Sequence, residues 1–274
     1  MVMPVRQLGV DDLCIHQVCL SGQCNFASSL SQLVAAGIKR TALWNPMIEN
    51  CGQRQALSFW NDSGLRADSL CVAELFAGPD KLRRMLDRAD LFKARTLVLI
   101  TGGLEAAGVE GGIDEARKYL PSLLAQADEL ARPYNVQLAF EPLHPMVCGF
   151  RSIVSSLGEA LDLLDQLGAA HEVGLAIDTY ALWWEDQSDQ KLLRASKRIL
   201  NYHVSDWLAD TSDLRLDRGM PGDGQINLLQ WRAQLEQFGY RGGVEIEIFS
   251  CDRWWKQAPE SMLKQIIERL NLAY

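Results

Sequence analysis

Short apolar segments alternate with amphipathic segments along almost the whole chain. Apolar runs of five to eight residues predict strands, whereas apolar positions that recur every three to four residues predict helices. Strands are predicted at 13–20, 40–44, 69–76, 96–102, 136–143, 173–180, 199–206 and 243–249. Helices are predicted most clearly at 114–134, 158–168 and 258–273. The pattern is that of repeated strand–helix units.

The spacing of these units predicts the fold. Consecutive strands start about 25 to 45 residues apart, and strands that alternate with helices form parallel sheets. Eight such units favour a closed (β/α)₈ TIM barrel over an open doubly wound sheet. No GxGxxG or GxxxxGK[ST] motif follows any strand, which argues against a nucleotide-binding open sheet. Because no linker or low-complexity segment interrupts the pattern, we expect one α/β domain over residues 1–274.

Composition narrows the class of partner. Hydrophobic residues make up 48% of the chain, and no segment approaches the roughly 20 uninterrupted apolar residues of a membrane span. The formal charge is −8 and the 27 Lys and Arg residues are scattered, which argues against nucleic-acid binding, because phosphate neutralisation supplies most non-specific affinity. The seven cysteines form no CxxC pair, and the N-terminus has no signal-peptide pattern. We therefore expect a cytoplasmic protein that binds neither membranes nor nucleic acid.

Four successive strands are apolar until each reaches one residue that can bind a metal ion. In a TIM barrel the reactive groups lie at the C-terminal ends of the strands. The last four predicted strands reach, in turn, Glu141, Asp178, His203 and Glu247. Three carboxylates crowded at one mouth of the barrel repel one another unless a cation compensates them. One imidazole with oxygen donors suits a single divalent ion, Mn²⁺ in the first place, with Mg²⁺, Co²⁺ or Zn²⁺ as alternatives.

Other polar and aromatic residues near these strand ends have simpler interpretations. Glu245 lies on the same face of its strand as Glu247 but one layer deeper, so we interpret it as a buried carboxylate with partners of its own. His16 lies inside the first strand, and we interpret it as a core or pocket-floor histidine. The tryptophan pairs 183–184 and 254–255 follow strands six and eight, where they could pack in the core or form pocket walls.

Several segments resemble one known family. The segments LAFEPLHPM, VGLAIDTYALWW, YHVSDWL, DRGMPGDGQINL and GGVEIEIFS resemble the sugar phosphate isomerase/epimerase family, the xylose isomerase-like TIM barrels. This family includes ketose 3-epimerases, hydroxypyruvate isomerase, inosose dehydratase, dehydroshikimate dehydratase and endonuclease IV. The resemblance covers most of the chain from the second strand onward and is densest from 138 to 255. It implies one divalent metal ion held by Glu141, Asp178, His203 and Glu247, with Glu141 and Glu247 also acting as the acid/base pair.

The resemblance also implies substrate-binding residues. They match His144, three residues past Glu141; Arg151, soon after it; and Arg218, which precedes the PGDG segment. One position departs from the family pattern. Relatives commonly carry a substrate-contacting histidine three residues after the strand-six aspartate, where this chain has Ala181. The departure leaves the metal ligands in place but removes a hydrogen-bond donor to the substrate.

Together these residues predict a metal-dependent isomerase or epimerase of a ketose or related hydroxy-carbonyl sugar. A metal ion that chelates the carbonyl and an adjacent hydroxyl acidifies the neighbouring C–H. One glutamate takes that proton and the other returns one, through an enediolate. The same site would serve a dehydratase or lyase that acts on a keto-sugar or keto-cyclitol.

Two further alternatives rank lower. The abasic-DNA endonuclease branch uses a trinuclear zinc site with several additional histidines, and this chain has only four histidines and an acidic balance. A non-catalytic metal- or sugar-binding barrel is favoured only if Ala181 removes an essential group. The expected partner is a small-molecule carbohydrate, and whether the chain forms a homo-oligomer stays open.

Overall fold

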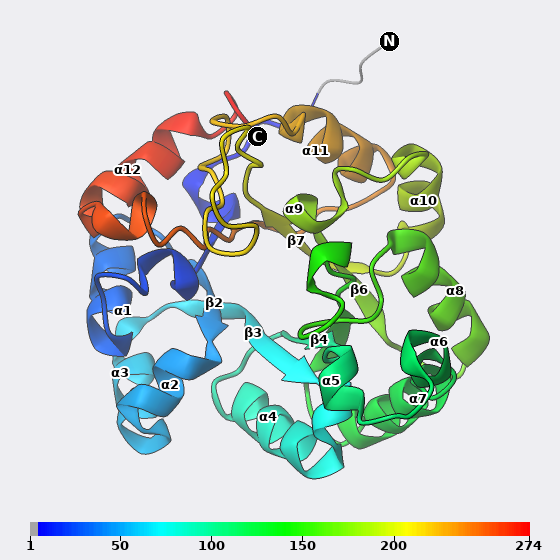
Figure 1. Cartoon of the computed structure of the whole chain (residues 1–274). Coiled ribbons are helices and arrows are strands. Elements are labelled where there is room, and N and C mark those ends of the chain that lie inside the picture. The colour runs from blue at the N-terminus through cyan, green and yellow to red at the C-terminus, as the bar shows by residue number, and fades with distance from the viewer. Residues whose placement is uncertain (1–4) are drawn as a thin grey trace.

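The predicted strands close into a parallel barrel in the computed structural model, which describes residues 5–274 (Figure 1). Each strand pairs with the next along the chain, and β1 pairs with β8 to close the ring. The closed eight-stranded barrel confirms the predicted fold class. The strands are β1 (Leu13–His16), β2 (Arg40–Trp44), β3 (Arg66–Glu74), β4 (Thr96–Ile100), β5 (Gln137–Phe140), β6 (Gly174–Asp178), β7 (Ile199–Val204) and β8 (Val244–Ile246).

Helices surround the barrel and cover the outer face of its strands (Figure 1). They are α1 (Phe26–Ala35), α2 (Asn45–Cys51), α3 (Gln53–Ser63), α4 (Pro79–Leu91), α5 (Leu104–Ala107), α6 (Gly112–Arg117), α7 (Leu120–Ala131), α8 (Leu157–Leu167), α9 (Thr179–Leu182), α10 (Ser188–Ala195), α11 (Leu228–Gln237) and α12 (Pro259–Arg269). Short 3₁₀ helices cover Val10–Asp12, Gln17–Leu20, Leu75–Ala77, Pro145–Val147 and Trp254–Lys256. Within residues 5–274, none of the helices combines the length and the apolar character needed to cross a bilayer.

Several predicted elements end earlier than their apolar pattern, and in two of them a single side chain explains the difference. The strand expected over 13–20 stops at His16, because Nδ1 of His16 accepts the N–H of Val18 at 3.0 Å and turns residues 17–20 into a 3₁₀ helix. The helix expected over 114–134 is two helices, α6 and α7. Pro121 lies in the first turn of α7, where the missing N–H of proline costs no helical hydrogen bond.

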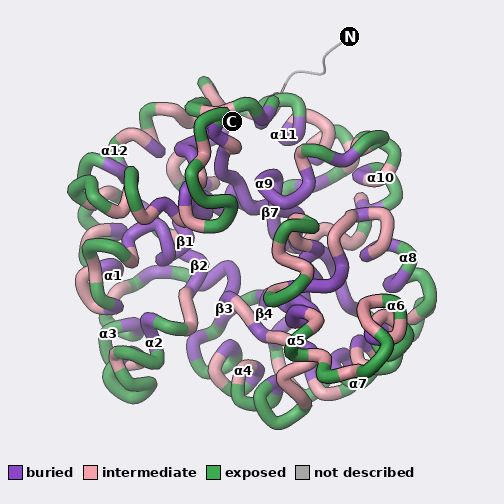
Figure 2. The backbone as a smooth tube through the Cα atoms, viewed as in Figure 1, coloured by how far each residue is buried: buried purple, intermediate pink, exposed green. Residues whose placement is uncertain are grey.

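Alternation along each strand separates the two faces of the barrel wall. Leu138 and Phe140 of β5 pack outward in the large core between strands and helices, whereas Ala139 belongs to a separate cluster of small buried residues. That inner cluster consists of Cys71, Val98, Ala139 and Ala176. Because side chains alternate with a period of two, Glu141 lies on the same inward side as Ala139. Figure 2 shows the resulting buried wall inside an exposed outer ring.

Long connections lie at the C-terminal mouth of the barrel. One connection runs from 141 to 156 between β5 and α8, and another runs from 205 to 227 between β7 and α11. Short antiparallel bridges hold the second connection to itself and to the segment after β8, at Asp206–Gly219 and Asp217–Ser250. These connections surround the inward-facing residues at the strand ends.

Candidate metal centre and active site

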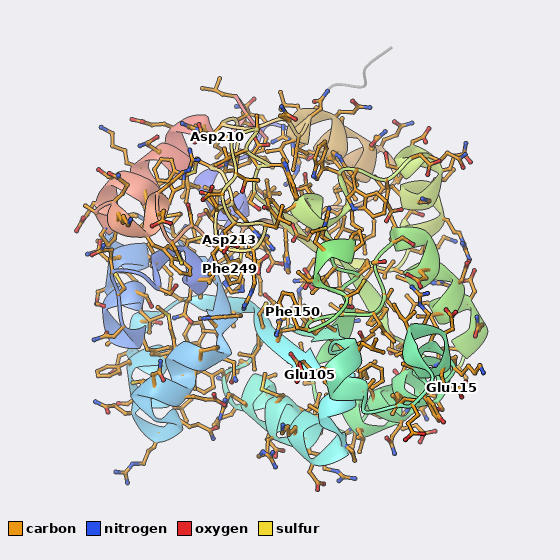
Figure 3. All side chains as sticks on the ribbon, viewed as in Figure 1. Glu105, Glu115, Phe150, Asp210, Asp213 and Phe249 are labelled. Carbon is orange, nitrogen blue, oxygen red and sulfur yellow. The ribbon has the colours of Figure 1, made fainter. Side chains whose placement is uncertain are left out.

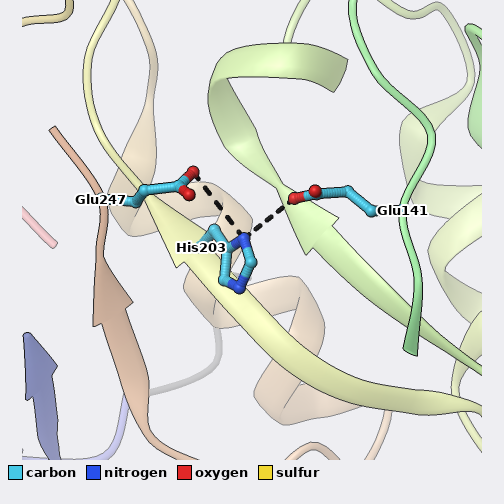
Figure 4. A group of neighbouring side chains, drawn as sticks. All are labelled: Glu141, His203 and Glu247. Atoms are coloured by element: carbon cyan, nitrogen blue, oxygen red, sulfur yellow. Dashed lines mark hydrogen bonds and ion pairs between the residues drawn. The ribbon is translucent and has the colours of Figure 1, made fainter. Parts of the chain in front are cut away.

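Three of the four predicted metal ligands meet at the C-terminal mouth of the barrel (Figure 4). Glu141 directly follows β5, His203 lies in β7 and Glu247 directly follows β8, and all three side chains are buried. Nδ1 of His203 lies 2.9 Å from Oε1 of Glu141 and 3.8 Å from Oε2 of Glu247. One donor atom from each residue lies within 4.8 Å of the other two.

This donor set fits a divalent cation. Imidazole nitrogen and carboxylate oxygen are ordinary ligands of Zn²⁺ and Mn²⁺. Ions of this kind hold their donors at about 2.0–2.2 Å, so donors a few ångströms apart can share one ion. Two buried carboxylates at this separation also need positive charge beside them, because burial and mutual repulsion both disfavour their ionised forms. The three residues therefore form a candidate metal site.

Asp178, the fourth predicted ligand, is joined to this cluster through Arg218. Oδ1 of Asp178 accepts the N–H of Tyr180 at 2.9 Å, which starts the short helix α9. Its Oδ2 lies 3.0 Å from Nη1 of Arg218, and the same Nη1 lies 3.0 Å from Oε2 of Glu247. The Arg218 guanidinium thus supplies positive charge between two of the predicted ligands.

The buried charges shift one another's protonation equilibria. Burial, only partly offset by Arg218, raises the pKa of Asp178 to about 6. Burial would also raise the pKa of Glu247, but the positive charges of Arg218 and His203 outweigh it and hold that pKa below its ordinary value. Glu247 is therefore ionised near neutral pH, as a group that accepts a proton must be.

Two residues that the sequence placed beneath the site lie there. Glu245 is buried and bonds to Ser69, whose Oγ donates at 2.8 Å, and to the side-chain amide of Asn201. Its Oε2 lies 3.5 Å from Nε2 of His203. Nε2 of His16 lies 3.5 Å from Oε1 of Glu247, and burial lowers the pKa of His16 to about 4. Glu245 thus has partners of its own, and neutral His16 is a buried core histidine beside Glu247.

A small cavity of ≈ 70 Å³ opens beside Glu141 and Glu247. The three residues expected to bind substrate, His144, Arg151 and Arg218, line this same cavity. Nδ1 of His144 accepts the N–H of Met146 at 3.2 Å, which leaves Nε2 as the protonated nitrogen of the neutral ring. Nη1 of Arg151 lies 2.7 Å from Oε1 of Glu74.

The aromatic and charged residues of the lining include four that escaped the sequence analysis. They are Trp44, Tyr180, Arg215 and Phe249. Tyr180 lies in α9 and Phe249 lies beyond the end of β8, so the strand alternation that placed the acids does not extend to them. Arg215 lies in the middle of a long connection, where no periodicity guides a prediction. Figure 3 shows Phe249 and Asp213 on one side of the barrel mouth and Phe150 across from them.

The two tryptophan pairs lie outside the residues that line the cavity in the described part of the chain. Trp183 packs against Trp207 with ring centroids 5.6 Å apart, and Nε1 of Trp184 donates to the carbonyl of Ala181 at 2.7 Å. The expectation that these pairs form pocket walls is therefore wrong for this cavity. Ala181 itself lines the cavity and presents only a methyl group there.

The connection from 205 to 227 is organised around one buried carboxylate. Oδ2 of Asp206 accepts the N–H groups of Gly222 and Gly224, each at 2.9 Å. Its Oδ1 accepts those of Trp207 at 2.9 Å and Ile226 at 3.0 Å. A Cβ at position 224 would lie 2.4 Å from Oδ1 of Asp206, so this close approach requires glycine. The anchored connection carries both Arg215 and Arg218.

Comparison with known proteins agrees with this architecture. The sequence profile of a family described as xylose isomerase-like TIM barrel matches residues 76–270. The inosose isomerase of Halalkalibacterium halodurans is 28% identical over 156 residues, which cover 54% of this chain and 52% of that protein. The chain thus spans about half the length of the curated relatives it matches.

Two solved structures share the fold over nearly the full chain. The protein SMc04130 from Sinorhizobium meliloti 1021 has a TM-score of 0.88 and 36% identity, covering 97% of this chain and 99% of that one. The IolI protein with a bound zinc atom has a TM-score of 0.78 and 18% identity, covering 95% of this chain and 96% of that one.

Proposed function

Since the chain belongs to the xylose isomerase-like TIM barrel family, we propose that it is a divalent-metal-dependent isomerase or epimerase of a sugar-like hydroxy-carbonyl compound. The observation that carries the proposal is the convergence of Glu141, His203 and Glu247 on one cavity at the barrel mouth. The similarity to inosose isomerases, although limited to half their length, supports the same class of reaction.

The metal ion would be held by His203 and the carboxylates around it, with Asp178 as the fourth ligand. When bound there, a divalent ion polarises a substrate carbonyl and favours loss of the neighbouring carbon-bound proton. The zinc atom bound by the IolI protein, which shares this fold, supports a divalent metal ion here. The donor set also suits Mn²⁺, Mg²⁺ or Co²⁺.

Proton transfer is assigned to Glu141 and Glu247. They follow β5 and β8, which β6 and β7 separate around the barrel, so the two carboxylates approach the cavity from different sides. One takes a proton from the substrate carbon and the other delivers a proton to the opposite face or to the adjacent carbon. Glu247, held ionised by Arg218 and His203, is in the protonation state that a proton acceptor needs.

Substrate orientation is assigned to His144, Arg151 and Arg218. All three carry N–H donors and line the cavity beside the carboxylates. Nε2 of His144 is the available donor of its ring, because Nδ1 already accepts a backbone N–H. His144 thus offers a donor in a cavity where Ala181 has none.

The test is solvent deuterium exchange into a panel of ketoses, inososes and keto acids in the presence of Mn²⁺. The wild-type protein should incorporate deuterium next to the carbonyl of one substrate class. Glu247→Gln should reduce the exchange rate on the order of 10²–10⁴-fold, because an amide cannot accept the proton. Glu268→Gln, an exposed change on α12, is the matched control and should keep the wild-type rate.

Other outcomes separate the alternatives. A product that has lost water identifies a dehydratase built on the same site. Exchange at the wild-type rate in Glu247→Gln would contradict the proton-transfer role of that glutamate. Absence of exchange with every substrate, while the protein still binds metal, would indicate a non-catalytic barrel.

A further inference from the structure

Three arginines converge on the cavity beside the candidate metal centre. Arg151, Arg215 and Arg218 all line it, and they come from two different connections. Arg218 forms ion pairs with Asp178 and Glu247, since its Nη1 lies 3.0 Å from a carboxylate oxygen of each. Arg151 is committed to a carboxylate of β3, since its Nη1 lies 2.7 Å from Glu74.

Arg215 differs from the other two arginines because its side chain has no such partner among residues 5–274. Within residues 5–274 its guanidinium forms no hydrogen bond and no ion pair. The acid two positions before it, Asp213, is already engaged by the backbone, because its Oδ1 accepts the N–H groups of Arg215 at 2.8 Å and Leu216 at 2.9 Å. Although Arg215 stays exposed to solvent, its partial burial and the like charges of Arg151 and Arg218 lower its pKa. The guanidinium of Arg215 is thus unpaired and lies near enough to Arg151 and Arg218 for their charges to act on it.

The backbone around Arg215 is fixed on both sides. Arg253 holds Asp217, with its Nε 2.9 Å from Oδ1, and Asp217 in turn accepts the N–H of Ser212 at 3.0 Å. The bridge between Asp217 and Ser250 joins this turn to the segment after β8. The turn that carries Arg215 is therefore positioned before any ligand arrives, which reduces the entropy lost on binding.

When the charged groups at the cavity are paired with one another, Arg215 is the arginine that takes part in no pair. The three carboxylates of the proposed metal centre are matched by a divalent ion together with Arg218. Arg151 is matched by Glu74. Within residues 5–274 the charge of Arg215 is in no ion pair, although the Asp213 carboxylate lies near enough to oppose the lowering of its pKa, and Arg215 lines a cavity whose other walls include aromatic rings. Such a site attracts an anion and disfavours a cationic ligand.

We propose that Arg215 binds an anionic group, a carboxylate or a phosphate, at the end of the substrate remote from the reacting carbon. The proposal rests on the function given above and narrows it, because the substrate becomes an acidic or phosphorylated hydroxy-carbonyl compound rather than a neutral sugar. A guanidinium suits this role, since its planar array of N–H donors matches carboxylate and phosphate oxygens in pairs.

The test compares three six-carbon probes that cannot isomerise because they lack an aldehyde or ketone group: D-gluconate, D-sorbitol 6-phosphate and neutral D-sorbitol. Isothermal titration calorimetry of the full chain loaded with Mn²⁺ measures the affinity of each. The wild-type protein should bind at least one anionic probe about tenfold or more tightly than sorbitol, as expected for charge-assisted hydrogen bonds. Preference for gluconate indicates a carboxylate substrate, and preference for the phosphate indicates a sugar phosphate.

Variants assign the preference to this residue. Arg215→Gln should abolish it without weakening sorbitol binding, and Arg215→Lys should keep part of it because the charge remains. Arg83→Gln on the exposed face of α4 is the control and should behave as wild type. A preference that persists in Arg215→Gln would arise at the metal ion or another arginine and would overturn the proposal. So would equal or undetectable binding of the anionic probes by the wild-type protein.

The deuterium experiment keeps this proposal separate from the proposed function. Anion preference that depends on Arg215, without deuterium exchange into any substrate, would leave the anion site standing and refute the isomerase. Exchange into neutral sugars by wild type and Arg215→Gln alike would leave the isomerase standing and refute the anion site.

Discussion

Arg218 lies among the buried carboxylates at the mouth of the barrel. Its Nη1 contacts Asp178 and Glu247, and its guanidinium carbon lies 4.5 Å from the centre of the Tyr180 ring and 5.1 Å from that of Phe249. The guanidinium therefore compensates carboxylates that a metal ion would compensate in the loaded protein. A bound metal ion and Arg218 would both neutralise the negative charge of the same carboxylates.

This overlap predicts that the loss of stability caused by Arg218→Met depends on whether a metal ion is bound. Without metal, the variant leaves buried carboxylates uncompensated, and we expect it to lose about 3–5 kcal/mol of stability, the usual cost of removing one partner of a buried pair. With Mn²⁺ bound, the loss should be clearly smaller. Thermal unfolding in EDTA and in excess Mn²⁺ measures both states. The exposed control Arg194→Met should change stability by at most about 1 kcal/mol in either condition. An equal loss in both conditions would contradict the shared role.

His144 gives a pH prediction. Burial holds the pKa of His144 below its ordinary value of 6.5. The unfolded chain therefore binds a proton at a higher pH than the folded chain, and folding is opposed as the pH falls from about 6.5 toward the folded pKa. Wild type should lose more stability between pH 8 and pH 5.5 than His144→Gln, in which this group does not titrate. Urea unfolding at the two pH values measures the difference, and parallel losses in the two proteins would refute the shift.

At the scale of elements, the alternation of each strand decides which side chains enter the barrel. Strand β8 shows this most clearly, because Glu245 and Glu247 lie on the same side at successive depths. The period of two can be read from the sequence, so the inward acids, the histidine of β7 and the deeper role of Glu245 were all predictable. Arg215 and Trp44 were not, because their positions depend on how connections fold over the mouth.

The connection between β7 and α11 gives a prediction about its anchor. Asp206→Ala would leave four backbone N–H groups without their acceptor, three of them in the distant segment 222–226. Each unsatisfied buried donor costs about 1–3 kcal/mol, so the connection should detach locally. We expect rapid proteolytic cleavage between 207 and 224 and weaker binding of any ligand of Arg215. Asp210→Ala, an exposed change on the same connection, should remain resistant to protease. Equal resistance in Asp206→Ala would show that the carboxylate is dispensable.

At the scale of the whole molecule, fold and chemistry occupy different parts of the chain. The barrel wall and its helices use apolar periodicity, which is a local property, and the sequence predicted all eight strands for that reason. The short break between α6 and α7 and the early end of β1 escaped prediction because single side chains, Pro121 and His16, override the apolar pattern. The proposed metal ligands are as predictable as the strands because they lie at the strand ends. The side chains that the connections place around the cavity cannot be predicted in this way, because the connections have no periodic pattern.

The carboxylate of Asp206 has a consequence for how this protein can diverge. It holds the two ends of the connection, residues 206–207 and 222–226, whereas the turn at 211–218 is held separately, by Asp217 and Arg253. Substitutions at exposed positions of that turn, such as Arg215, can therefore change the side chains at the cavity without loosening the ends of the connection, whereas Asp217 and Arg218 are tied to other residues. The exposed part of the turn can therefore change in sequence while the anchored ends stay the same. Proteins that share the candidate metal ligands can thus diverge in specificity through single substitutions there.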